Sequence, residues 1–475
     1  MKPSRILLCI LSTFIVLAAV CALGAGKSET VRVPSLASVL GLPLESSEFS
    51  ESSESSEVFV PSDTSELSEL SEPSVPAQPV HADTTPAKPV PVVLPKALPQ
   101  TKLSLPLFYA ALDKAGKQSV RIVHFGDSQI EEDRISMILR RRLQDRFGGG
   151  GIGLVPMVQT IPTYTAKQTL EQNGHEIPYT AIRRYLAYGP SAMRMKDDNR
   201  YGPMAQLAYI DQPVDVRVEL LRDRVPTYDY DHVRVLCTDS VTVIVDPDSV
   251  PVQQPLIALA EPRRNILLHF GGKGYVYGIS LETATGVQVD NIPMRGAAGT
   301  NFTAMARQPF ADYFRQTNTA LIIMQFGGNA MPAIRTHAAV EKYIQSMRQQ
   351  IQFIMSAAPD ASLLFIGPSD MITTVEGELQ TYPMLPHLDR ALAAMVEEEG
   401  GAYYSLFRLM GGAGSMISWR DKGLAGEDMI HFTRAGAKKV GEMLAKQLLE
   451  DYDSLVESQK SKEESPDTIT DQMPQ

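Results

Sequence analysis

The stretch that most constrains the fold of this chain is RIVHFGDSQIEED, residues 121–133, in which an apolar run stops at a Gly-Asp-Ser turn. The run reads as a buried strand, and apolar residues then recur at helical spacing from Ile135 to Leu143. A strand followed at once by a helix is the repeating unit of a parallel α/β sheet. The sequence therefore predicts an open α/β fold with Ser128 just beyond its first strand, where such sheets bind their ligands.

The same stretch resembles the first sequence block of the SGNH or GDSL hydrolases, a GDS turn after the first strand. Three further blocks of that family follow in order: MRGAAGTNF resembles the second, QFGGNAMP the third and EDMIHFTRAG the fifth. The matching residues are Gly299, Asn329, Asp428 and His431. The resemblance covers roughly residues 118–148 and 275–450. It implies a three-layer α/β/α, flavodoxin-like parallel sheet.

The resemblance also implies a mechanism. A serine hydroxyl needs a base to take its proton and a carboxylate to orient that base, and these roles fall to Ser128, His431 and Asp428. The oxyanion hole is expected from the backbone amides of Ser128 and Gly299 and from the side-chain amide of Asn329. Glycine permits close backbone approach, and an asparagine amide donates without carrying a charge.

Two features limit what can be transferred from known hydrolases. The family often has an aspartate after the asparagine of its third block, whereas Ala330 follows here, so no role is assigned to that position. The G-x-S-x-G elbow of the ordinary α/β-hydrolases is absent, which argues against that other serine-hydrolase fold.

Residues 1–26 predict either a secretory signal or a retained membrane anchor. Lys2 and Arg5 precede an apolar run through Leu23 that is about long enough to span a bilayer. This length slightly favours an anchor at residues 6–24 with the N-terminus inside, although Ala22-Leu23-Gly24 offers a cleavage site. Either reading predicts export to the periplasm or cell envelope. Lipidation at Cys21 is a minor alternative, because Val20 fits a lipobox poorly.

Residues 27–104 are rich in Ser and Glu and then in Pro, a composition that cannot bury a core and predicts a disordered linker. The polar segment 452–475 is likewise predicted to be a disordered tail. Cys237 is the only one of the three cysteines beyond the N-terminal segment, so no disulfide is expected there. Its apolar neighbours favour a buried strand residue over a nucleophile.

Residues 152–285 change to the alternation of antiparallel strands, as in DVRVELLR, VTVIVD and YVYGISLE. This pattern predicts a small β-sandwich inserted between the two parts of the hydrolase domain, 105–151 and 286–451. Bacterial peptidoglycan O-acetylesterases of the family are similar in carrying such an insert. Two hypotheses remain open for four tyrosines of the insert: they stack on sugars, or they serve only in packing. These residues are Tyr164, Tyr179, Tyr185 and Tyr188.

The second part of the hydrolase domain alternates strands and helices up to a final helix that Thr433 caps and that ends near residue 449. His124 is expected to be a satisfied core histidine, Asp127 a turn residue and Asp133 a first-turn carboxylate. His337 and His387 show no recurring ligand spacing, so neither a metal nor a cofactor is predicted. The run Gly148–Gly151 lacks the lysine of a phosphate-binding loop and predicts a hinge.

Together these features predict an exported serine esterase that acts on an acylated polysaccharide, with O-acetyl groups of peptidoglycan as the first choice. The net charge of −11 argues against a nucleic-acid partner. An O-acetyltransferase with the same triad is the first alternative, because only the acceptor differs. A noncatalytic polysaccharide-binding protein is the second, although a binder needs no oriented base. The only membrane contact expected is through the N-terminal segment.

Overall fold

The structure is a computed structural model that describes residues 102–188, 201–221, 227–246, 250–251 and 256–463. The chain divides into two units, 1–79 and 80–475, and every described residue belongs to the second. The predicted signal or anchor and nearly all of the predicted linker lie outside the described residues. Among the helices that are described, none has the length and apolar character needed to cross a bilayer.

A parallel sheet of five strands forms the centre of the α/β part. Its strands, in spatial order, are β14 (Gly286–Pro293), β1 (Ser119–Gly126), β15 (Thr319–Gln325), β16 (Ser362–Ile366) and β19 (Ala402–Tyr404). Because neighbouring residues of a strand face opposite sides, β1 contributes Val123 and Phe125 to one core and Val120 and Ile122 to the other. Both faces of the sheet are therefore covered.

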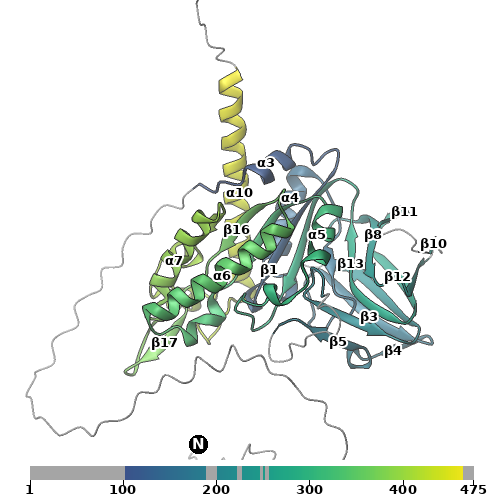
Figure 1. Ribbon diagram of the computed structural model, residues 1–475, viewed down its shortest axis with the longest axis horizontal. Coiled ribbons are helices and arrows are strands. Elements are labelled where there is room, and N and C mark those ends of the chain that lie inside the picture. The colour runs from purple at the N-terminus through teal and green to yellow at the C-terminus, as the bar shows by residue number, and fades with distance from the viewer. Residues whose placement is uncertain (1–101, 189–200, 222–226, 247–249, 252–255, 464–475) are drawn as a thin grey trace, which may run out of the picture. The chain divides into compact units, whose positions relative to one another are not determined.

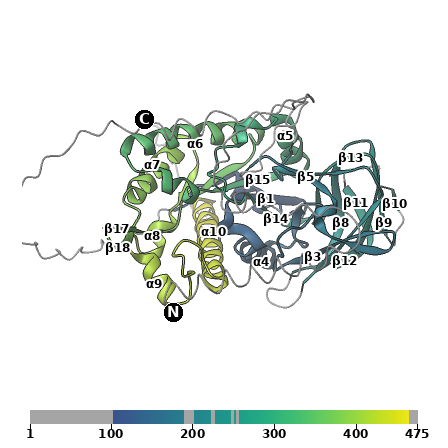
Figure 2. The ribbon, with the colours of Figure 1, turned by 90° about the horizontal axis from the view of Figure 1, so that it is seen from below.

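Helices cover the two faces of this sheet (Figure 2). One face packs against α5 (Arg307–Gln316), α6 (His337–Ala357) and α7 (Leu385–Glu398). The other packs against α3 (Pro106–Leu112), α4 (Ser136–Phe147), α9 (Ser415–Asp421) and α10 (Arg434–Glu463). The short elements are α8 (Leu406–Met410), η4 (Phe302–Ala304), η5 (Gly328–Ala333) and the hairpin β17 (Ile372–Val375) with β18 (Glu378–Thr381). The predicted three-layer α/β/α architecture is confirmed.

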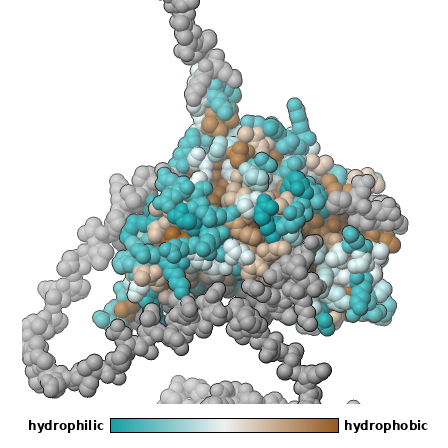
Figure 3. Space-filling view, in the orientation of Figure 1, coloured by the Kyte–Doolittle hydropathy of each residue, from teal (hydrophilic) through white to brown (hydrophobic). Residues whose placement is uncertain are grey.

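Local sequence explains where these helices begin and which side they bury. Thr336 caps α6, its hydroxyl accepting a hydrogen bond from Ala339 N at 3.2 Å. The apolar residues of α6, such as Val340, Met347 and Ile354, face the sheet. Its outer surface and that of α7 are mostly hydrophilic in the space-filling view (Figure 3), as expected for amphipathic helices over a core.

Between α4 and β14 the chain forms two antiparallel sheets of six strands each (Figure 1). The first contains β10 (Val250–Pro251), β9 (Val241–Asp246), β12 (Asn265–Gly272), β7 (Val214–Leu220), β3 (Ala166–Gln172) and β4 (His175–Ile177). The second contains β11 (Leu256–Arg263), β8 (Tyr230–Cys237), β13 (Gly274–Glu282), β6 (Gln206–Ile210) and β5 (Arg183–Leu186), with β2 (Gly153–Val155) paired to β13. A turn of 3₁₀ helix, η3 (Tyr179–Ala181), precedes β5. Alternate residues of both sheets share one core, as in a β-sandwich.

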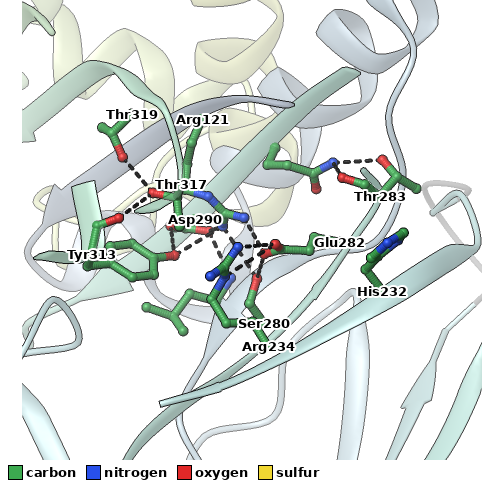
Figure 4. A network of polar contacts seen from close by, with 12 residues as sticks. Arg121, His232, Arg234, Ser280, Glu282, Thr283, Asp290, Tyr313, Thr317 and Thr319 are labelled. Carbon is green, nitrogen blue, oxygen red and sulfur yellow. Dashed lines mark hydrogen bonds and ion pairs between the residues drawn. The ribbon is translucent and has the colours of Figure 1, made fainter. Parts of the chain in front are cut away.

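A buried network of ion pairs joins the insert to the parallel sheet (Figure 4). Arg121 on β1 donates to Asp290 Oδ1 at 2.6 Å, to Tyr313 Oη at 3.0 Å and to Glu282 on β13. Arg234 on β8 donates a second bond to Glu282 at 3.1 Å. Burial works against ionisation of Glu282, but Arg121 and Arg234 outweigh it and hold its pKa below the ordinary value. Each buried charge therefore has a partner.

Two expectations about the ends of the insert and the chain are wrong. The glycine run 148–151 is not a hinge, because it lies against neighbouring strands: a Cβ on Gly149 would be 2.5 Å from Val287 O and one on Gly151 would be 2.0 Å from Leu281 O. Residues 452–463 are not a disordered tail, since α10 continues to Glu463. Tyr452 fixes this extension by packing against Tyr109 and Phe147.

Candidate active site

The predicted site residues come from segments that meet at the carboxyl edge of the parallel sheet. Ser128 follows β1, and Asn329 lies in η5 just after β15. Asp428 and His431 lie in the loop between α9 and α10. Ser128, Asn329 and His431 line one pocket of about 150 Å³. The fold thus brings Ser128 together with residues that lie 200 or more positions away along the chain.

A chain of two hydrogen bonds links the serine, the histidine and the aspartate. Ser128 Oγ lies 2.9 Å from His431 Nε2, and His431 Nδ1 lies 2.8 Å from Asp428 Oδ2. With a proton on Nδ1, the ring donates to the carboxylate and presents an unprotonated Nε2 to the serine hydroxyl. This tautomer lets His431 accept the proton of Ser128.

The loop that carries the histidine is held by its own hydrogen bonds. Asp428 Oδ1 accepts from Ile430 N at 3.0 Å and from His431 N at 3.1 Å, while Gly426 N donates to His431 O at 2.8 Å. Burial alone would raise the pKa of Asp428, but the hydrogen bonds from the His431 ring and these two amides outweigh it and lower that pKa. Asp428 is therefore a stable anion about half exposed to solvent, at 47%.

Ser128 begins a short 3₁₀ helix, η2 (Ser128–Asp133), and the regular helix α4 starts only at Ser136. The helix predicted from the apolar spacing of Ile135 to Leu143 is therefore confirmed as α4, and η2 separates it from the turn. Glu132 and Asp133 both have positive φ values, 62° and 61°, which interrupt the helix. Asp133 is not a first-turn carboxylate: it is buried and accepts from Arg140 Nη1 at 2.6 Å and from Thr165 Oγ1 at 2.8 Å.

Sequence reasoning missed two residues that join the serine segment to the histidine loop. Gln129 Nε2 donates to Ile430 O at 2.7 Å. Arg134 donates to Ser128 O at 2.5 Å and to Phe432 O at 3.3 Å. Both therefore fix the distance between nucleophile and base. The only signal in the sequence is their position within six residues of Ser128.

Asp127 is a turn residue, as expected, and its surroundings give it an unusual pKa. Its Oδ1 accepts from Gln129 N at 2.9 Å and caps η2. Burial raises the pKa of Asp127 to about 6, against the lowering effect of the Gln129 amide and of nearby His431. Asp127 lines the same pocket as Ser128 and His431.

Asn329 lines the pocket, whereas Gly299 does not. Asn329 Nδ2 donates to Ala297 O at 3.2 Å, which leaves its second N–H for a ligand. Gly299 is not among the residues that line the pocket. Its φ is +82°, and a Cβ there would lie 2.7 Å from the Phe326 ring, so packing by itself requires glycine.

The other polar residues singled out in the sequence have structural roles. His124 is buried between Ser136 Oγ at 2.9 Å and Gln325 Oε1 at 3.1 Å, and burial lowers its pKa to about 4. Burial raises the pKa of the Cys237 thiol to about 11, which makes it a poor nucleophile. His337 and His387 pack edge to face. Within the described residues no three potential ligands cluster as a metal site.

Comparison with known proteins identifies the fold. Neither the models of known protein families nor the curated proteins give a match. A solved structure described as a peptidoglycan O-acetylesterase matches with a TM-score of 0.60 and 19% identity, over 73% of this chain and 96% of that one. Two acetylxylan esterases cover much less of this chain. The match to AlAXEase covers 34% of this chain and 80% of that one, with 11% identity and a TM-score of 0.26. The match to the enzyme from Geobacillus stearothermophilus covers 35% of this chain and 73% of that one, with 14% identity and a TM-score of 0.25. The first match shows a shared fold across nearly the whole solved chain, and with it the predicted fold class is confirmed.

Proposed function

We propose that this protein is an exported serine esterase that removes O-acetyl groups from a cell-envelope polysaccharide such as peptidoglycan. The observation that carries the proposal is the chain of contacts from Ser128 Oγ through His431 to Asp428, with distances of 2.9 and 2.8 Å, beside a pocket that Ser128 and His431 line. A histidine with only a structural role would not need a hydroxyl at one ring nitrogen and a carboxylate at the other. It would also not need to be accessible to solvent.

In the first half of the reaction Ser128 Oγ attacks the ester carbonyl carbon while its proton moves to His431 Nε2. Asp428 stabilises the imidazolium that forms. The carbonyl oxygen becomes an oxyanion, which the backbone amide of Ser128 and the free N–H of Asn329 would stabilise. Collapse of this intermediate breaks the bond to the sugar oxygen. His431 returns the proton to that oxygen, which leaves as a sugar hydroxyl.

The second half releases the acyl group. Water attacks the acyl-enzyme, and His431 takes one of its protons as general base. A second tetrahedral intermediate then collapses and breaks the bond to Ser128 Oγ, which regains its proton from His431. The products are acetate and the free enzyme. The Gly299 amide remains a proposed third donor to the oxyanion.

The size of the pocket supports a short acyl group. A volume of about 150 Å³ lies well below that of sites for drug-sized ligands, which start near ~300 Å³. The solved protein that shares this fold is described as a peptidoglycan O-acetylesterase, which supports a polymer of the same class. The apolar N-terminal segment, residues 6–24, supports action outside the cytoplasm.

The test is acetate release from O-acetylated peptidoglycan and from acetylated xylan by the full-length protein and by Ser128→Ala. We expect release that Ser128→Ala abolishes. Equal release by both proteins would refute the serine mechanism. Acetate that reaches an added sugar acceptor instead of water would identify the protein as an O-acetyltransferase, and polymer binding without any turnover would identify a binding protein.

A further inference from the structure

A cavity next to the candidate active site lies between η2 and the β-rich insert. It measures about 500 Å³, and we call it the seam pocket. Glu131 and Glu132, near the end of the segment that begins with Ser128, form part of its wall, as does Asn291 near the end of β14. Glu131 lies three positions after Ser128, so their Cα atoms are at most about 11 Å apart. One polymer could therefore occupy both pockets.

The wall of the seam pocket combines apolar surface with a few polar groups, as ligand sites generally do. The apolar part comes largely from the insert and includes Leu154, Val158 and Leu186. Tyr188 adds a ring, and Gln168 and Arg184 add polar ends. Sugars present both apolar faces and hydroxyl groups, so they can contact both the apolar and the polar parts of this wall. A hydrocarbon chain would contact only the apolar part.

Gln168 provides the sharper argument because it leaves an acceptor without a donor. Its side-chain Nε2 donates to Pro156 O at 2.9 Å and its backbone N donates to Gln159 Oε1 at 2.9 Å. Its Oε1 is buried and has no hydrogen-bond partner in the described part of the chain. A buried acceptor without a donor costs about 1–3 kcal/mol. After a small turn of the Gln168 side chain toward the cavity, a ligand hydroxyl or N–H in the seam pocket would donate to this oxygen and remove that cost, and an acyl chain could not.

Arg184 provides a second argument, from charge. The other two guanidinium groups of the wall are paired, Arg140 with Asp133 at 2.6 Å and Arg295 with Glu131 at 2.5 Å. No carboxylate of the described residues forms an ion pair with Arg184, whose guanidinium lies 5.9 Å from the centre of the Tyr179 ring. A carboxylate on the ligand would complete this pairing.

We propose that the seam pocket binds the sugar units next to the acylated one, with Gln168 accepting from a sugar hydroxyl or N–H and Arg184 pairing with a carboxylate of an acidic sugar. This inference rests on the proposed function, because it names the part of the polysaccharide that lies beyond Ser128. It assigns the seam pocket to substrate selection and leaves the chemistry to the triad.

The test compares Gln168→Met and Arg184→Gln with matched controls on the same strands. Gln172 on β3 also donates to a proline carbonyl, Pro213 O at 3.1 Å, but lies outside the seam pocket, so Gln172→Met is the control for Gln168→Met. Arg183→Gln serves in the same way for Arg184→Gln, because Arg183 is exposed and also lies outside this pocket. Each protein is assayed on O-acetylated peptidoglycan and on 4-nitrophenyl acetate, a small ester that reaches only the triad.

We expect each seam-pocket variant to lose about tenfold in kcat/KM on the polymer, through KM, and to keep the wild-type rate on the small ester. The controls should match the wild type on both substrates. Equal polymer activity in all five proteins would overturn the proposal. An equal loss in variants and controls, or a loss on the small ester as well, would also overturn it, since either result indicates a structural effect.

A binding measurement separates this inference from the proposed function. Calorimetry with the full-length Ser128→Ala protein should detect muramic-acid-containing oligosaccharides, and should detect neutral chitooligosaccharides of the same length at least tenfold more weakly. Adding Gln168→Met or Arg184→Gln should remove that preference. If no ester is ever hydrolysed but this preference is found and lost as described, the seam pocket stands and the esterase proposal fails. If esters are hydrolysed and the preference is absent, the seam pocket fails alone.

Discussion

Two clusters of charged groups in this molecule use similar side chains in opposite surroundings. In the candidate triad, His431 and Asp428 are 43% and 47% exposed. In the network that joins the insert to the sheet, Arg121 and Asp290 are fully buried and Glu282 is 4% exposed. The first cluster can exchange protons with solvent and substrate, and the second cannot.

The difference shows how burial divides the work of charged residues. An exposed pair adds little to stability, because water screens it and solvates each partner when the other is lost. A buried pair leaves an uncompensated charge when one partner is lost, which is strongly destabilising. Substitutions in the triad should therefore change the rate of ester hydrolysis and leave the free energy of unfolding nearly constant. Substitutions in the network should lower the free energy of unfolding, while the protein that remains folded keeps a nearly constant rate.

The largest effect is expected for Asp428→Asn. The amide cannot hold the His431 tautomer that leaves Nε2 free, so kcat on 4-nitrophenyl acetate should fall about 10⁴-fold. Thermal unfolding should stay within a few degrees of the wild type, because the side chain is half exposed. A fall of less than tenfold would remove Asp428 from the triad.

Arg121→Met should be the most destabilising substitution of the network. It leaves Glu282 and Asp290 buried without their cation, and the free energy of unfolding should drop by about 3–5 kcal/mol in denaturant titrations. The control is Arg142→Met, whose partner is Glu442 and whose side chain is 51% exposed; it should cost at most about 1 kcal/mol. Equal losses in the free energy of unfolding for the two variants would contradict the expected difference between buried and exposed ion pairs.

Asn329→Ala tests the oxyanion hole. Removing one donor should lower kcat about 10²–10³-fold, with KM little changed, because the bond forms fully only in the transition state. The lost bond to Ala297 O should cost only about 1 kcal/mol of stability. A matching fall in stability and activity would instead indicate that the side chain only supports the loop.

The smallest effect is the pH dependence that buried His124 should give to stability. Its folded-state pKa of about 4 lies below the unfolded value of 6.5, so between these values the unfolded state binds a proton that the folded state does not. Stability is therefore lost as the pH falls from 6.5 to 4, by up to about 3 kcal/mol. The free energy of unfolding should change less with pH across this range in His124→Asn than in the wild type. An identical pH dependence in the two proteins would show that His124 does not cause it.

Much of the fold was predictable because its signals are local. The predicted alternation of strands and helices in the second part of the hydrolase domain is present, for example in the strand Ser362–Ile366 and the helix Leu385–Glu398, since each has a clear apolar pattern between turn residues. The extension of α10 to Glu463 was missed because that stretch looks polar. Contacts with distant parts of the chain anchor it, among them those of Tyr452 with Tyr109 and Phe147, which lie more than 300 positions earlier.

The sequence by itself determined which residues are candidates for chemistry, because a serine after a strand, an asparagine after another and an Asp-x-x-His loop are patterns of residue type and order. Only the tertiary structure decided their geometry: the 2.9 Å contact from Ser128 to His431, the bridging roles of Gln129 and Arg134, and the absence of Gly299 from the residues that line the pocket. Distances between segments 300 residues apart depend on how the whole sheet packs. No local pattern contains that information.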